Sequence, residues 1–423
     1  MVISANGRSM VTVPSTRRGS GVMTFTARVR AVAWCLLAAI APLRSLADPE
    51  VGDGGVDAFY RWTSSIPDGP PRVVRREALA ADKSLAQASV SERILYTSRG
   101  GPRGERGIIV SGTVYLPRGK APATGWPVIA WAHGTVGFPD ICAPSFDGWS
   151  ERDTAYLDNW LAQGYAVVAS DYEGLGTEGP HPYMMSRSEA TGVLDAVRAA
   201  RRSYPLAADV VLVGQSQGAH AAANAGLMQR ELAPELKIRG IVLTGWPGSM
   251  DMRPVRMDGF DPWAILYLRF LPTYAWLDPS FRPGSVLTPA GQAVYEGFRT
   301  TCGSSGMQAF LQQKPVTNTL FARDPSPLEM RAHPYRAYPP LAFTVPVFLG
   351  IGLKDEQTSP RASFDSARRA CDLGSALEVR FYPGLMHGPT VLRSQQDSIP
   401  WVRSVFEGTP GPGNCKAATF PTD

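Results

Sequence analysis

The stretch VVLVGQSQGAHAAA, residues 210–223, decides the fold of this chain. Its first four residues are apolar and predict a short buried strand, and the small residues after Gly218 predict a helix packed closely on that strand. Between them, GQSQG at 214–218 matches the pattern G-x-S-x-G. A turn this tight leaves room only for small residues two positions either side of the serine, and it exposes the serine hydroxyl at the start of the helix. The pattern predicts that Ser216 is a nucleophile; the alternative is a structural Ser-Gly turn.

Strands and helices alternate on both sides of this unit. We predict strands at 93–97, 107–116, 127–132, 165–170, 210–213, 238–244, 345–350 and 377–382. We predict helices at 153–163, 186–203, 217–230, 360–369 and 393–406. Short apolar strands separated by helices are typical of an α/β fold, in which helices cover both faces of a mostly parallel sheet.

One long segment interrupts this alternation. Between Trp246 and Pro346 the chain is rich in proline and aromatic residues and has no strand pattern. Insertions in such sheets belong on the loops at the carboxyl ends of strands, so we predict an inserted helical cap. The predicted organisation is a leader at 1–47, an irregular N-terminal arm at 48–90, a core at 91–245 and 345–423, and the cap at 246–344.

The N-terminus carries most of the excess positive charge. Residues 1–47 hold six arginines and no acidic residue, and they include an apolar stretch, Ala31–Leu43, and the small-residue site Ser45-Leu46-Ala47. This is the pattern of a secretory signal cleaved near Ala47, although an uncleaved membrane anchor is the alternative. Without it, 42 basic residues fall to 36 against 37 acidic ones, and the net charge of +5 becomes −1. We therefore expect a secreted or periplasmic protein with no nucleic-acid partner and no transmembrane segment in its mature part.

A serine nucleophile needs a base and an acid that orients it, in the chain order Ser, acid, His in this arrangement. Of the five histidines, His387 follows the strand at 377–382 and is the predicted base. Asp355 follows the strand at 345–350 and is the predicted acid. Asp251, a few residues after the strand at 238–244, is the rival acid.

The developing oxyanion needs backbone N–H donors. The residue after the nucleophile, Gln217, supplies one of them. The second comes from the loop after the strand at 127–132, where Gly134 and Thr135 are the candidates.

Four cysteines remain after removal of the leader: Cys142, Cys302, Cys371 and Cys415. An even number in an exported chain predicts two disulfides, and these residues alone allow three pairings. Their spacing does not match a zinc site, and we predict no metal.

With these residues in place, the chain resembles the secretory lipase family over residues 90–415. The resemblance is carried by AWAHGTVGFPDICAPS (130–145), DYEGLG (171–176), YMMSRSEATGVLDAVRAAR (183–201), VGQSQGAHAA (213–222) and LTPAGQAVYEGFRTTC (287–302). It implies an α/β-hydrolase fold with a helical cap and a triad of Ser216, Asp355 and His387. It also implies the disulfides Cys142–Cys302 and Cys371–Cys415.

The expected function is hydrolysis of carboxylic esters, as a lipase or esterase, through an acyl-enzyme and without a cofactor. The expected substrate is a lipid or small-molecule ester, with a lipid–water interface as a place of action. An acyltransferase or serine peptidase on the same fold is the alternative, and a non-catalytic binding module is a more distant one.

Overall fold

The computed structural model describes residues 55–250, 252–261, 263–303 and 315–421. The described residues belong to one compact unit. The predicted leader and its cleavage site near Ala47 lie outside the described residues.

A nine-stranded sheet organises the described chain, in the order β1-β2-β3-β5-β4-β6-β7-β8-β9. The strands are β1 (Val73–Ala78), β2 (Ala88–Gly100), β3 (Arg106–Pro117), β4 (Trp126–Ala132), β5 (Ala166–Ser170), β6 (Leu206–Gln215), β7 (Lys237–Thr244), β8 (Val347–Gly352) and β9 (Leu377–Tyr382). The first three strands are antiparallel to their neighbours, and β5, β4 and β6–β9 run parallel. The predicted mostly parallel sheet is confirmed.

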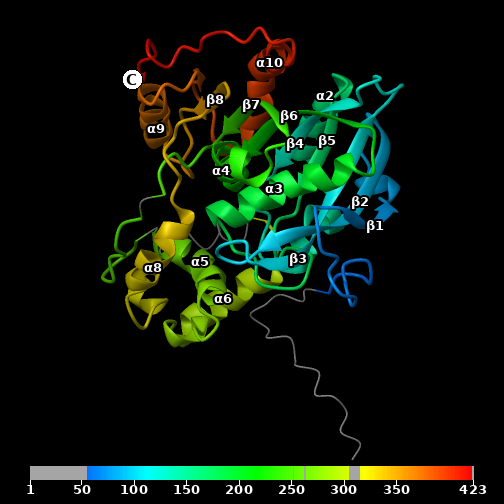
Figure 1. Cartoon of the computed structure of the whole chain (residues 1–423). Coiled ribbons are helices and arrows are strands. Elements are labelled where there is room, and N and C mark those ends of the chain that lie inside the picture. Colours follow the sequence, from blue (N-terminus) through cyan, green and yellow to red (C-terminus); the bar gives the residue numbers. More distant parts are fainter. Residues whose placement is uncertain (1–54, 251, 262, 304–314, 422–423) are drawn as a thin grey trace, which may run out of the picture. The chain divides into compact units, whose positions relative to one another are not determined.

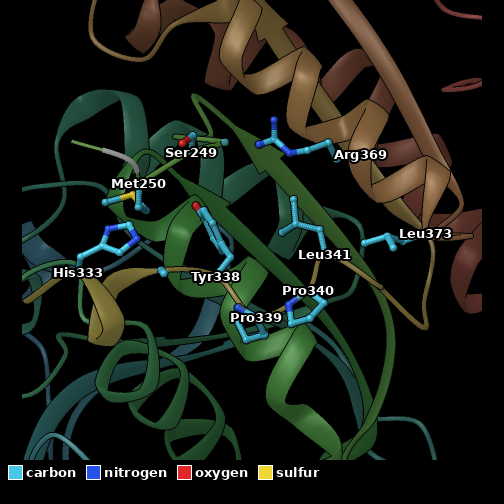
Figure 2. A pocket seen from close by; sticks show the side chains of 11 residues that line it. Ser249, Met250, His333, Tyr338, Pro339, Pro340, Leu341, Arg369 and Leu373 are labelled. Carbon is cyan, nitrogen blue, oxygen red and sulfur yellow. The ribbon is translucent and has the colours of Figure 1, made fainter. Parts of the chain in front are cut away.

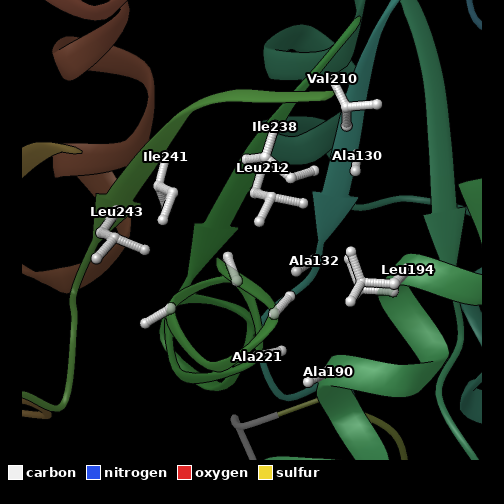
Figure 3. Close-up of a cluster of buried hydrophobic side chains, with 14 of the residues drawn as sticks. Ala130, Ala132, Ala190, Leu194, Val210, Leu212, Ala221, Ile238, Ile241 and Leu243 are labelled. Atoms are coloured by element: carbon white, nitrogen blue, oxygen red, sulfur yellow. The ribbon is translucent and has the colours of Figure 1, made fainter. Parts of the chain in front are cut away.

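Helices cover both faces of this sheet (Figure 1). They are α2 (Glu151–Ala162), α3 (Ser186–Arg201), α4 (Gln217–Leu232), α9 (Pro360–Asp372) and α10 (His387–Phe406), besides the single turn α1 (Pro144–Asp147). Because side chains alternate along a strand, β6 feeds two separate cores. Val210 and Leu212 pack with α3 and α4, whereas Val211 and Val213 pack with α2 and α10. Figure 3 shows the first core, where small side chains such as Ala221 and Ala190 let the two helices lie close to the strands.

Two elements differ from the prediction. The stretch expected to be an irregular arm contains β1, which pairs with β2 at the sheet edge. Its sequence, VVRREA, ends in exposed residues, two of them charged, so it lacks the apolar pattern by which a buried strand is predicted. The last helix begins at His387 rather than at 393, because Pro389 lies in its first turn, where proline is tolerated.

The segment between β7 and β8 contains α5 (Trp263–Leu277), α6 (Pro289–Thr300) and α8 (Ser326–Arg336). These helices gather at one end of the sheet (Figure 1) and enclose their own apolar cluster, which includes Tyr267, Leu268 and Phe270. The cluster also contains Tyr183 and Met185 from the segment before α3, so the inserted helices pack on the core. The boundaries of the arm, the core and the cap are still predictions.

Two disulfides join distant parts of the chain, Cys142–Cys302 and Cys371–Cys415. These are the pairings that the family resemblance implies. The first connects the loop after β4 to the end of α6, and beside it the Gly303 N–H donates to the Val136 carbonyl at 2.6 Å. The inserted helices are thereby held to the loop that contains Gly134 and Thr135.

We expect the double variant Cys142→Ser/Cys302→Ser to lose about 2–5 kcal/mol of unfolding free energy, because 160 residues separate the two cysteines and the unfolded chain gains freedom. Urea unfolding measures this. The matched variant Cys371→Ser/Cys415→Ser opens a separation of 44 residues and should lose about 1 kcal/mol less. Unchanged urea midpoints in both variants would contradict the expectation.

Candidate functional site

Ser216 lies alone between the end of β6 and the start of α4, with φ 57° and ψ −119°. A positive φ is unfavourable for a residue with a Cβ, and such backbone strain is concentrated at functional sites. The two glycines of the motif make this turn feasible. A Cβ on Gly218 would lie 1.7 Å from the Ala132 carbonyl oxygen, and one on Gly214 would lie 2.0 Å from the Gly218 carbonyl oxygen. The side chain of Ser216 is partly exposed.

Asp355 and His387 form a buried hydrogen-bonded pair. Asp355 follows β8, and its Oδ2 accepts from Nδ1 of His387 at 2.7 Å. Its Oδ1 accepts from the backbone N–H groups of Gln357 and Thr358, each at 2.9 Å. Burial opposes ionisation of this carboxyl, but the hydrogen bonds from His387 and Thr358 outweigh it and lower the pKa of Asp355. The pair is arranged as an ionised acid that orients an imidazole.

Strand β7 brings this pair to the serine. The backbone N–H of Ser216 donates to the Thr244 carbonyl at 3.0 Å. The next residue, Gly245, has φ 55°, and a Cβ there would lie 2.5 Å from Cε1 of His387. The structure therefore brings Ser216, Asp355 and His387 together at the carboxyl ends of β6, β7 and β8. Among the described residues the Ser216 hydroxyl has no hydrogen-bond partner, and Nε2 of His387 contacts Gln215 instead, at 2.9 Å.

The predicted oxyanion donors come from two segments near the turn at Ser216, which we call the elbow: the start of α4 and the loop after β4. Gln217 is the first residue of α4, and the first N–H groups of a helix have no partner within it. Gly134 follows β4, and a Cβ on it would lie 2.1 Å from Oε1 of Gln215. Thr135 is fixed by a 2.7 Å hydrogen bond between its Oγ1 and the Tyr183 hydroxyl.

His133 shapes the same loop. It is 1% exposed, and its Nδ1 lies 2.7 Å from the Gly134 carbonyl oxygen, to which it donates. Burial lowers the pKa of His133 to about 4, so this imidazole is neutral near pH 7. Its position suits a structural role in the loop.

A buried polar network lies beside Gln217 at the start of α4, and no sequence pattern predicted it. The Gln217 amide donates to Oε1 of Glu189 at 2.9 Å and approaches Nε2 of His181 at 3.0 Å. Glu189 also accepts from Nδ1 of His220 at 2.8 Å. Burial lowers the pKa of His181, whose Nδ1 faces the Glu173 carbonyl, so its Nε2 is free to accept from Gln217. The network fixes the side chain of the residue whose N–H is the predicted oxyanion donor.

A cavity of about 410 Å³ lies between the segment after β7, the end of α8, and α9 (Figure 2). Tyr338 and Leu341 line its apolar side and Arg369 points across it. None of the three triad candidates lines this cavity. Separately, no helix among the described residues is both long and apolar enough to cross a membrane.

Comparison with known proteins finds similar sequences among the lipases. The secretory lipase family matches residues 150–320. Lipase A of Moesziomyces aphidis is 37% identical over 207 residues, which is 46% of this chain and 43% of that protein. Lipase 7 of Candida albicans is 32% identical over 102 residues, 23% of each chain. The matched part thus spans less than half the length of these relatives.

Over the matched residues the chain is similar to the secretory lipases. Solved structures share the fold of this chain. The closed state of Candida antarctica lipase A is 21% identical with a TM-score of 0.64, over 86% of this chain and 88% of the other. A rice cell wall degrading esterase, LipA from Xanthomonas oryzae, is 20% identical with a TM-score of 0.59, over 80% and 99%. The predicted α/β-hydrolase fold and the family resemblance are confirmed.

The rival acid, Asp251, lies outside the described residues. The roles of the site residues are predictions that the geometry supports.

The close approach of Gly218 to the Ala132 carbonyl can be tested by adding a methyl group at position 218. Gly218→Ala should lower the unfolding free energy by about 1–3 kcal/mol, because the added methyl overlaps the backbone of β4. The matched control is Gly297→Ala in α6, where a Cβ meets nothing within 4 Å. That variant should gain up to about 1 kcal/mol from helix propensity. Calorimetry of both variants measures the difference, and equal midpoints would contradict the packing argument.

Proposed function

We propose that this protein is a secreted serine hydrolase that cleaves carboxylic esters of the lipase or esterase class. The observation that carries the proposal is the 2.7 Å hydrogen bond from His387 to Asp355 beside the strained turn of Ser216. An oriented imidazole next to a partly exposed serine hydroxyl is the arrangement that activates a serine for attack on an acyl group. The relationship to secretory lipases favours esters as the acyl donors.

The chemistry proceeds in two halves. The Ser216 oxygen attacks the ester carbonyl while Nε2 of His387 takes its proton, and the negative charge moves to the carbonyl oxygen. The backbone N–H of Gln217, with that of Thr135 or Gly134, stabilises this oxyanion. The alcohol leaves with the proton from His387, and an acyl-enzyme remains. Water then attacks with His387 as base, and the acid leaves Ser216 free.

Asp355 contributes by its charge and by its position. Its lowered pKa keeps it ionised at neutral pH, so it stabilises the imidazolium that forms in each half. Because its folded pKa is depressed, its contribution is present at neutral pH and is lost as acid protonates it.

Secretion belongs to the same proposal. The arginine-rich leader with its small-residue site near Ala47 and the two disulfides both suit an exported protein. The similarity of residues 150–320 to the secretory lipase family supports the same location.

Hydrolysis of p-nitrophenyl esters from acetyl to palmitoyl tests the function. Ser216→Ala should lower kcat/KM by a factor on the order of 10⁶, because the triad acts as a unit. Ser203→Ala, which changes an exposed serine, is the matched control and should keep wild-type rates. Activity on long chains indicates a lipase, and activity on short chains alone indicates an esterase.

Wild-type rates in the Ser216→Ala variant would contradict the mechanism. A folded wild-type protein that cleaves no ester would contradict the proposed function and favour a peptidase, an acyltransferase or a binding module.

A further inference from the structure

The side chain of Gln215 is held among three parts of the site. Gln215 is the last residue of β6, directly before Ser216, and it is 2% exposed. Its Nε2 lies 2.9 Å from Nε2 of His387. Its Oε1 lies 3.5 Å from Nη2 of Arg152 on α2. The absence of a side chain at Gly134 leaves the space that this Oε1 occupies. The carboxamide of Gln215 therefore lies against three groups: the predicted base His387, the guanidinium of Arg152, and the loop after β4 at Gly134.

The partners of Gln215 and His387 fix the direction of their hydrogen bond. Asp355 can only accept, so Nδ1 of His387 carries its proton toward it. In the neutral ring Nε2 is then the acceptor, and the Gln215 amide N–H donates to it. The other end agrees, because the carboxamide oxygen faces the guanidinium of Arg152, which can only donate. Both ends of the amide thus have the orientation that their neighbours require.

This hydrogen bond has a chemical consequence. A donor directed at Nε2 stabilises the neutral imidazole and disfavours the imidazolium. The ring also offers one in-plane lone pair at Nε2, and the Ser216 hydroxyl must use that same lone pair to transfer its proton. Gln215 therefore occupies the proton-accepting atom before the serine does.

We propose that Gln215 is a positioning residue for His387: before substrate binds, its amide holds Nε2 of the imidazole directed at the elbow, and the Ser216 hydroxyl takes the place of the amide when the reaction begins. This inference rests on the proposed function, in which His387 is the base. It assigns a role to the residue that stands before the nucleophile in the motif.

Charged groups from two further elements face this pair. Asp355, after β8, contacts Nδ1 of His387. On α2, Arg152 is paired with Asp153, its Nε and Nη2 donating to Oδ1 at 2.9 and 2.8 Å. Nη1 of Arg152 would be 3.8 Å from a Cβ on Gly388, beside the base. Since Arg152 already has a carboxylate partner, replacing the neutral Gln215 by glutamate adds one uncompensated negative charge next to Nε2.

The experiment measures how fast a fluorophosphonate labels Ser216 between pH 4 and pH 9 in the full mature protein. Labelling forms a bond from the serine oxygen to phosphorus, expels fluoride and passes the serine proton to His387, so it needs no natural substrate. The variants are Gln215→Glu, which places a carboxylate at Nε2, and Gln215→Asn, whose shorter amide does not reach it. Gln396→Glu makes the same charge change at an exposed position of α10 and is the control.

The acidic limb of the labelling profile carries the result. A carboxylate at Nε2 favours the protonated imidazole, so the limb should move to higher pH by about one to three units in Gln215→Glu. In Gln215→Asn the limb should move in the same direction by less than one unit, because only the donor is lost. Gln396→Glu should keep the wild-type limb. Near-ultraviolet circular dichroism checks that each variant is folded.

Two outcomes overturn the inference. One is a limb that stays at the wild-type pH in both Gln215 variants, even if the labelling rate falls at every pH, since that pattern indicates a packing role alone. The other is a limb that moves to lower pH in Gln215→Glu. A wild-type protein whose Ser216 takes no label at any pH is a different result, because it contradicts the proposed function itself.

Discussion

The close approach of helix α4 to strand β4 at Gly218 is the constraint on which the site depends. The Cα of Gly218 is so near the Ala132 carbonyl oxygen that a Cβ would overlap it, and the turn before it forces Ser216 to a positive φ. The alanines that follow are buried in the core between α4 and the sheet, and Figure 3 shows Ala221 among them. Because the turn is so tight, the serine hydroxyl stands out at the carboxyl end of β6, where residues that follow neighbouring strands can reach it. The strain at one residue is thus balanced by the packing of a whole helix.

Around this turn, polar groups are arranged in two sets with different surroundings. Above it lie the ionised Asp355, His387 and the Gln215 carboxamide, all buried apart from the serine itself. Beneath it, Glu189 connects Gln217 to His220, and His220 in turn contacts the Arg336 carbonyl at the end of α8. The lower set joins the first turn of α4 to α3 and to the end of α8. The lower set therefore holds the side chain of Gln217, whereas the upper set contains the proposed base and acid.

The sequence predicted those parts of the fold that follow from local pattern. The strands at the centre of the sheet were predicted because apolar runs such as Val210–Val213 and punctuating glycines mark them, and Leu377–Tyr382 is found at the predicted bounds. The edge strand β1 was not predicted, since half of it is exposed and charged. Residues of one motif predicted the serine, and chain order proposed His387 and Asp355. The contacts of Gln215, Glu189 and His181 could not be predicted, because each joins residues 28 or more positions apart whose pairing only the packed sheet defines.

The central claim is that Ser216 carries the acyl group during turnover. Acid quenching during the pre-steady-state reaction with p-nitrophenyl acetate, followed by proteolysis and mass spectrometry of the peptides, tests it most directly. The account predicts an added acetyl group on Ser216 and none on any other serine, with the adduct disappearing as substrate is consumed. Burst release of p-nitrophenol with the acetyl group on another residue, or turnover with no acetylated peptide at any time, would contradict it.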